Sequence, residues 1–145
     1  MERLDTRSHH WWITWELVKA MSAPGALSQP VRQTAILCVG GHFNAAYELY
    51  THMAMEHSRD VSDSRLTTLA TGSRPKDMNE EEGCAHDVAH ALVRAGILPE
   101  PCYARAIKLF GQKGTSELIY LVGLYALVSV TLNGFDVAVP VASES

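Results

Sequence analysis

Glu48 and His52 are the residues of this 145-residue chain whose types and spacing best fit proton-transfer chemistry. They lie four residues apart in a segment with helical periodicity, so both side chains should project from one helix face. A carboxylate beside an imidazole holds the ring and sets its tautomer, as a general acid or base requires. The alternative interpretation is a partly exposed ion pair on a solvated helix face, which is a common arrangement of small energetic value.

Arg32 and His42 are further candidates on the same predicted helix. Arg32 has the geometry to bind a substrate carboxylate through two parallel hydrogen bonds, and a structural salt bridge to a glutamate is an equally good interpretation. His42 lies about 80° from His52 around a helix, so we expect it at the mouth of a pocket. His57 is about 140° from His52, and we expect it at the surface.

A second group of polar residues, Cys84, His86, Asp87 and His90, competes with the first. His86 and His90 have the spacing that two zinc ligands use on one helix face. A metal site also needs a third ligand, which the sequence supplies only by supposition. We therefore expect no metal and no other cofactor, and we interpret His86 and His90 as pocket or interface side chains.

The composition predicts a single domain, residues 1–145, with a hydrophobic core. The chain is 47% hydrophobic and 19% charged, and its net charge is −4, so it lacks the basic surface that nucleic acid or an anionic membrane would require. Cys38, Cys84 and Cys102 are too far apart in the sequence to form a Cys-x-x-Cys motif, which favours a reducing compartment. Met1–His10 has no apolar stretch of the secretory type, so we expect a cytoplasmic location.

Two apolar features predict self-association. Leu118–Leu132 is an apolar run of 15 residues, shorter than the ~20 that a membrane helix needs, and we interpret it as a buried helix partly covered by another subunit. Trp11, Trp12 and Trp15 form a cluster for which core or subunit packing is the first interpretation and a flat substrate wall is the second.

The pattern of apolar residues, caps and breakers predicts an all-α fold of about six helices. Only residues 135–139 alternate as a strand would, and they directly precede Pro140. The predicted helices cover residues 11–21, 31–57, 62–71, 80–96, 99–111 and 115–132.

Several segments, in this order and spacing, resemble one known family. They are Pro30–Leu37, Ala46-Tyr47-Glu48 with His52, Val61-Ser62, Phe110-Gly111, Glu117–Gly123, Tyr125, Asn133 and Phe135. Over residues 27–140 the chain resembles the carboxymuconolactone decarboxylase and alkylhydroperoxidase D group of small all-α proteins, with residues 1–26 as an N-terminal helix and extension. The resemblance implies that group's helical fold and a homo-oligomer, for which we expect a trimer or a hexamer.

The resemblance also shows what this chain lacks. In the peroxidase branch the equivalent helix carries Cys-x-x-Cys, and here Ala45 and Glu48 stand at those positions while the downstream histidine remains as His52. Disulfide chemistry is therefore excluded at this site. The branch's upstream glutamate corresponds to Gln33, an amide that orients groups by hydrogen bonds and does not accept protons at neutral pH.

The remaining pattern resembles the decarboxylase branch, where a tyrosine–glutamate–histidine arrangement replaces the cysteines. It implies a cofactor-free site in which His52 transfers a proton and Glu48 orients it, with Tyr47 and Tyr125 among the side chains that contact substrate. Glu56 and Asp60 depart from the family pattern of a small residue and a glycine, which puts the exact reaction in doubt.

We therefore expect a cofactor-independent, decarboxylase-type lyase with His52 and Glu48 as catalytic residues. Its substrate would be a small oxygenated molecule bearing a carboxyl, lactone or enol group, from aromatic degradation or secondary metabolism. The substrate-binding candidates are Arg32, Gln33, His42, Tyr47 and Tyr125. Isomerase, cyclase or dehydratase activity on the same fold, a redox protein using the cysteines, and a non-catalytic binding protein are the alternatives.

Overall fold

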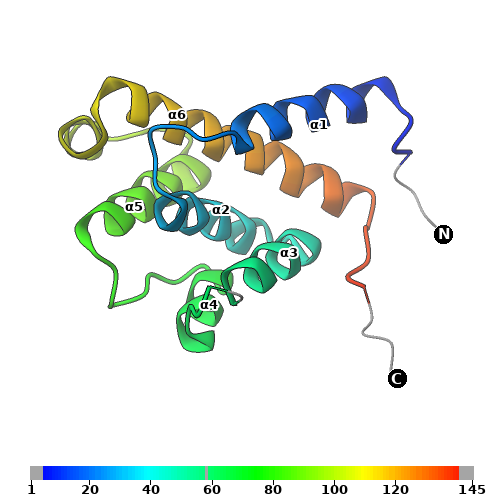
Figure 1. The fold of residues 1–145 in the computed structure, drawn as a ribbon, viewed down its shortest axis with the longest axis horizontal. Coiled ribbons are helices and arrows are strands. Elements are labelled where there is room, and N and C mark those ends of the chain that lie inside the picture. The colour runs from blue at the N-terminus through cyan, green and yellow to red at the C-terminus, as the bar shows by residue number, and fades with distance from the viewer. Residues whose placement is uncertain (1–4, 58, 141–145) are drawn as a thin grey trace.

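The chain folds into six α-helices and no strand within residues 5–57 and 59–140, which are the residues that this computed structural model describes (Figure 1). This confirms the predicted all-α class. The helices are α1 (His9–Ser22), α2 (Gln29–Phe43), α3 (Ala46–His57), α4 (Asp63–Ala70), α5 (Glu80–Ala95) and α6 (Glu100–Gly134).

Local sequence explains where three of these helices begin. The side chains of Ser8, Ser62 and Asn79 each accept a hydrogen bond from a backbone N–H in the first turn of α1, α4 and α5. Such caps satisfy donors that have no partner within the helix. The prediction that Asn79 caps the fifth of these helices is confirmed.

The predicted continuous helix over residues 31–57 is wrong, because the chain turns between α2 and α3. Asn44 adopts a left-handed conformation (φ 49°) and its N–H bonds to the carbonyls of Gly40 and Gly41. Asparagine tolerates this conformation better than other residues with a side chain, so it can end a helix as glycine often does. His42 and His52 consequently lie on different helices, and the angle predicted between them does not apply.

The two helices predicted over 99–111 and 115–132 are joined in α6. Gly111 has a positive φ of 68° and breaks the helical geometry at the expected residue, but helix resumes directly after it. Glycine adopts such a φ without a steric penalty. The alternation at residues 135–139 forms no strand in the described part of the chain, which passes from a turn into irregular backbone there.

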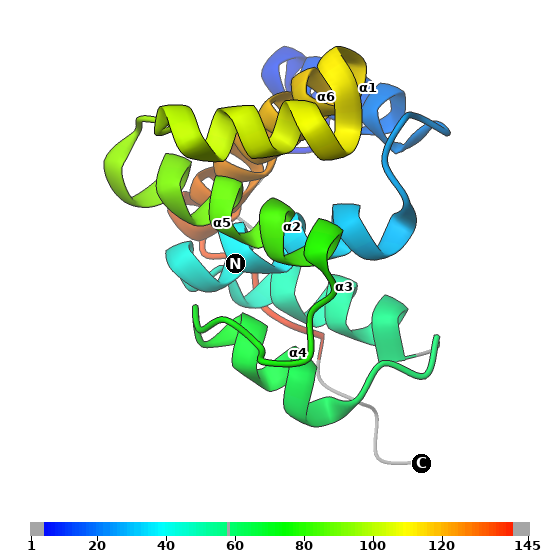
Figure 2. The ribbon, with the colours of Figure 1, turned by 90° about the vertical axis from the view of Figure 1, so that its left-hand side faces the viewer.

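Helix α2 lies at the centre of the fold. Ten consecutive residues, Val31–Gly40, are buried, and α2 packs on α3, α4, α5 and α6. Figure 2 shows α2 between α5 and α6 on one side and α3 and α4 on the other. A helix buried on all sides needs such cover, and it can present side chains to several neighbours at once.

Helix α6 provides much of the remaining core. It is the one helix in the described residues that is long and apolar enough to cross a membrane, by length and composition only, and half of its most apolar stretch is buried in the fold. Leu118, Leu121 and Tyr125 belong to the main core cluster, as expected for the helix of a packed core. Its outward side exposes Ile119, Tyr120, Leu127 and Val130.

Helix α1 lies at the edge of the fold. It contains no buried residue; it packs on α6, and its Met21 carbonyl accepts a hydrogen bond from Arg32 of α2 (Figure 1). The rings of Trp11 and Trp15 stack with their centroids 6.5 Å apart, while Trp12 is exposed. Helix α1 therefore forms a side wall of the molecule and not part of its core.

Gly41 marks a close approach of α2 and α4, and its replacement by alanine should destabilise the fold. A Cβ atom there would lie 2.6 Å from the Leu69 carbonyl oxygen and 3.0 Å from that of Ala70. These are backbone atoms, so the helices must separate, and we expect a loss of about 1–3 kcal/mol in the free energy of unfolding by urea denaturation.

Gly123→Ala is the matched control for this change. Gly123 lies within α6, and its Cβ would meet no atom within 4 Å. The control should gain about 0.5–1 kcal/mol, because alanine favours the helix. Equal effects of the two substitutions would contradict the close approach of α2 and α4.

Candidate functional site

His52 is held by hydrogen-bonding groups on both sides of its ring. Its Nδ1 atom lies 2.8 Å from Gln33 Oε1 on α2, and its Nε2 atom lies 3.1 Å from Glu48 Oε2 on α3. Both Glu48 and His52 are buried, with 9% and 7% of their surfaces exposed. The structure thus brings three of the predicted site residues together, and the pair is not a solvated surface ion pair.

The chemistry of Gln33 determines where the proton on the ring lies. Its Nε2 atom donates toward Met55 Sδ at 3.6 Å, which leaves Oε1 facing His52. An amide oxygen only accepts hydrogen bonds, so Nδ1 of His52 must carry hydrogen. Nε2 of His52 lies 3.1 Å from Oε2 of Glu48, which is the distance of an ion pair, and this buried oxygen has no hydrogen-bond partner among the described residues.

Tyr125 contacts the same imidazole from α6. The two rings meet edge to face, with centroids 5.4 Å apart and planes at 84°. Burial raises the pKa of Tyr125 to about 12; the charge of Glu48 raises it further and that of Arg32 opposes the shift. The phenol therefore stays protonated at neutral pH and can donate a hydrogen bond to a substrate oxygen.

Glu48, His52 and Tyr125 line a cavity of about 510 Å³ bounded by α1, α3 and α6. Tyr47, another predicted site residue, also lines it. Helix α1 contributes the tryptophans of the predicted cluster that stack on each other, Trp11 and Trp15. Trp11 and Trp15 therefore lie at the wall of a cavity, whereas Trp12 is exposed.

Arg32 and His42 lie away from this cavity. The Arg32 guanidinium is buried, bonds to Glu117 Oε1 at 2.6 Å and donates to the Met21 carbonyl. The structure therefore confirms the interpretation of Arg32 as part of a structural salt bridge. His42 is exposed, with its ring against Phe43, and does not reach the mouth of the cavity.

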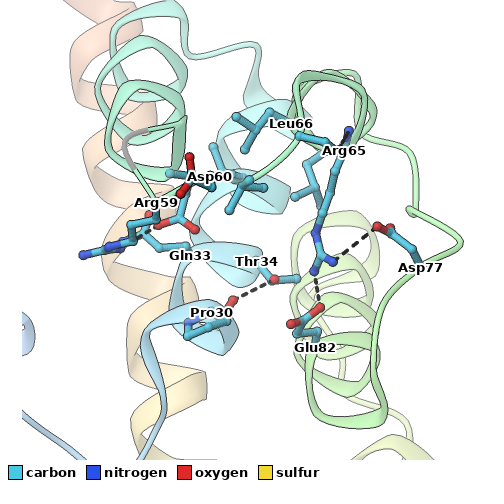
Figure 3. Close-up of a pocket in the computed structure, with 14 residues that line it drawn as sticks. Pro30, Gln33, Thr34, Arg59, Asp60, Arg65, Leu66, Asp77 and Glu82 are labelled. Atoms are coloured by element: carbon cyan, nitrogen blue, oxygen red, sulfur yellow. Dashed lines mark hydrogen bonds and ion pairs between the residues drawn. The ribbon is translucent and has the colours of Figure 1, made fainter.

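A second cavity of about 450 Å³ is lined by Gln33, a predicted substrate-binding residue that does not line the first cavity (Figure 3). The second cavity is lined by charged side chains that are largely paired: Arg59 with Glu56 at 2.6 Å, and Arg65 with Glu82 and, at 3.7 Å, with Asp77. The departures from the family pattern, Glu56 and Asp60, thus line the second cavity and not the wall of the first.

The sequence did not single out Arg65 or join it to Glu82. They are 17 positions apart, and no local pattern links them. The pair forms because the side chain of Arg65 on α4 reaches across the second cavity to Glu82 in the first turn of α5 (Figure 3).

His86 and His90 stack on each other on α5, with ring centroids 5.9 Å apart. His86 is 3% exposed and neither ring nitrogen makes a hydrogen bond within the described residues. Those residues contain no cluster of three or more His, Cys, Asp or Glu side chains that could hold a metal ion. In the described structure His86 is thus a buried side chain and His90 a half-buried one.

The cysteines are free thiols in the described structure, and two of them are buried. Burial raises the pKa of Cys38 to about 12, and burial also raises the pKa of Cys84. The thiolate is the reactive form, so both residues are poorly suited to redox chemistry at neutral pH.

Burial of His86 should make the fold sensitive to acid. Desolvation lowers the pKa of His86 from its ordinary 6.5; His90 and Arg74 act in the same direction and Asp87 opposes them. As the pH falls below about 6.5, His86 is protonated in the unfolded chain before it is protonated in the folded chain. The free energy of unfolding therefore decreases. We expect His86→Leu to flatten the fall in stability between pH 7 and pH 5 in urea denaturation.

His57→Gln is the control for this effect. His57 is exposed and lies 3.1 Å from Asp63. Its replacement should leave the acid-induced loss of stability in place. If the free energy of unfolding of His86→Leu fell with pH as steeply as that of the unsubstituted protein, other groups would be the cause of the loss.

Comparison with known proteins identifies the fold. No family model and no curated protein matches the chain. A crystal structure of a protein of unknown function from Agrobacterium tumefaciens, proposed to be an antioxidant defence protein AhpD, matches with a TM-score of 0.85. The match covers 98% of this chain and 100% of that one at 13% sequence identity. This similarity shows an AhpD-like fold, as the resemblance in the sequence predicted.

Proposed function

We propose that this protein is a cofactor-independent acid–base catalyst of the lyase or isomerase type, with His52 and Glu48 as its catalytic residues. The observation that carries the proposal is the buried Gln33–His52–Glu48 arrangement, in which Nε2 of His52 lies 3.1 Å from a carboxylate oxygen at the wall of a cavity. We propose that these two groups share one proton. Burial removes competing water, which strengthens the electrostatic interactions that such transfer uses.

Each residue would have a distinct role in the reaction. Gln33 holds Nδ1, so exchange of the ring proton takes place at Nε2. Glu48 balances the charge when His52 becomes imidazolium, and either partner can deliver the shared proton to a bound molecule. The Tyr125 hydroxyl is placed to hold the substrate oxygen on which negative charge develops.

Two reactions use these parts. In decarboxylation, the C–C bond to the carboxylate breaks, its electrons form an enolate, and the pair returns a proton to carbon. In isomerisation, the pair removes a proton from one carbon and returns it to another atom of the same molecule. Both require an adjacent carbonyl or lactone and neither requires an oxidant.

We also propose that the protein is a homo-oligomer in a reducing compartment such as the cytoplasm. The outer sides of α1 and α6 expose large apolar residues, which isolated subunits seldom do over a wide area. They include Trp12, Ile13, Leu17, Leu127 and Val130. The buried free thiols favour the reducing compartment.

Mass-resolved product analysis tests the proposed function. A panel of β-keto acids, lactones and enolisable ketones would be incubated with the protein and with its His52→Ala variant. A loss of 44 mass units indicates decarboxylation, a loss of 18 dehydration, and an unchanged mass with altered retention isomerisation. Product formed equally by both proteins would overturn the proposal, whereas binding without any product would support a binding protein.

A further inference from the structure

We infer that the cavity beside His52 binds an uncharged, mainly apolar ring compound that carries a single carbonyl or enol oxygen, and not a carboxylate. This inference rests on the proposed function for its site, and it names the class of molecule that the site accepts. It departs from the carboxyl-bearing substrate expected from the sequence, and of the two proposed reactions it favours isomerisation over decarboxylation.

The wall of the cavity is the first argument. Aromatic and aliphatic side chains cover most of it, among them Trp11, Trp15, Val18, Val128 and Leu132. The hydroxyl groups of the wall belong to threonine, serine and tyrosine side chains. Apolar pockets with few polar groups bind apolar ligands and use the polar groups to orient them.

The charge of the cavity is the second argument. Among the described residues no lysine or arginine lines it, and its ionisable side chains are Tyr47, Glu48, His52 and Tyr125. Glu48 contributes an acidic group 3.1 Å from His52 Nε2, and the raised pKa of Tyr125 keeps its phenol neutral. A carboxylate in this cavity would lose its water without gaining a cationic partner.

Arg32 adds no positive charge to the wall of the cavity. It is the arginine that the sequence suggested for a substrate carboxylate, but Glu117 and the Met21 carbonyl occupy its guanidinium. Its side chain is 6% exposed, and it is absent from the wall of the cavity. A bound carboxylate would instead meet the acidic oxygen atoms of Glu48.

The tryptophans provide a direct signal for binding. All three tryptophans of the chain are in α1, and Trp11 and Trp15 line the cavity. Intrinsic tryptophan fluorescence therefore reports on α1, and two of its three tryptophans line the cavity. Because α1 contains no buried residue, a ligand that fills the cavity should also increase hydrogen-exchange protection of α1.

The test compares two probes of the same shape, benzylacetone and 3-phenylpropionate, at pH 8. They differ in a methyl group that replaces a carboxylate oxygen. We expect benzylacetone to bind at least about tenfold more tightly, measured by fluorescence and by calorimetry. Equal or tighter binding of 3-phenylpropionate, or no binding of either probe, would overturn the inference.

A charge placed on the wall should reverse the preference. Thr14 lies on α1, lines the cavity and is half-buried, so Thr14→Arg would add the missing cation. We expect this variant to bind 3-phenylpropionate at least about tenfold more tightly than the unsubstituted protein does. Ile13→Arg adds the same charge to α1 outside the cavity and should leave both affinities unchanged.

These binding experiments separate the inference from the proposed function. Selective binding of benzylacetone without turnover of any neutral ketone would retain the ligand class and reject the catalyst. His52-dependent turnover of carboxylates, together with tight binding of 3-phenylpropionate, would retain the catalyst and reject the ligand class.

Discussion

Replacement of His52 by alanine is expected to lower kcat/KM by about 10²–10⁴-fold, because it removes the group that carries the proton. The imidazole is buried between Gln33 and Glu48, and no second imidazole lines its cavity. The measurement is steady-state kinetics on a substrate identified from the product panel. Retained circular dichroism and an unchanged urea midpoint would show that the variant still folds.

Two variants make this test specific. His42→Ala removes an exposed imidazole outside the cavity and should leave kcat/KM unchanged. Glu48→Gln keeps the shape of the side chain, but it removes the carboxylate that shares the proton with Nε2, so kcat should fall while KM changes little. If His52→Ala retained full activity, proton transfer by this residue would be ruled out.

Replacement of Glu117 by glutamine is expected to be the most destabilising single change among those considered. Glu117 accepts from Arg32 Nη1 at 2.6 Å and from the Ala26 N–H at 2.7 Å, and both side chains of the ion pair are largely buried. The substitution leaves a buried guanidinium without its counter-charge, which costs about 3–5 kcal/mol. Urea denaturation would measure the loss as a lower midpoint at unchanged slope.

A double variant distinguishes loss of a pair from loss of packing. Arg32→Met combined with Glu117→Met removes both charges, and replacing a buried pair by apolar side chains is often close to neutral. We therefore expect the double variant to be more stable than Glu117→Gln alone. A double variant at least as unstable as the single one would show that the pair stabilises the fold beyond charge compensation.

The local sequence was sufficient to predict where helices with clear caps or breakers begin or end. Asn79 begins α5 and Gly111 breaks α6 where the sequence indicated. The turn at Asn44 was missed because the nearest glycines, Gly40 and Gly41, lie within α2, and the left-handed conformation is only one option for asparagine. The position expected for His42 was therefore wrong, because the angle between His42 and His52 was predicted for a single helix.

The sequence by itself determined the Glu48–His52 pair, because a spacing of four residues within a helix brings two side chains together whatever surrounds them. Only the tertiary structure decided what that pair can do. The packing of α2 on α3 brings Gln33 to Nδ1, and α1 and α6 close an apolar cavity over the carboxylate and the imidazole. Contacts between residues distant in the chain depend on how whole helices pack, and no local spacing records them. The same packing directs Arg32 to Glu117, 85 positions away, and so leaves the cavity without a cation.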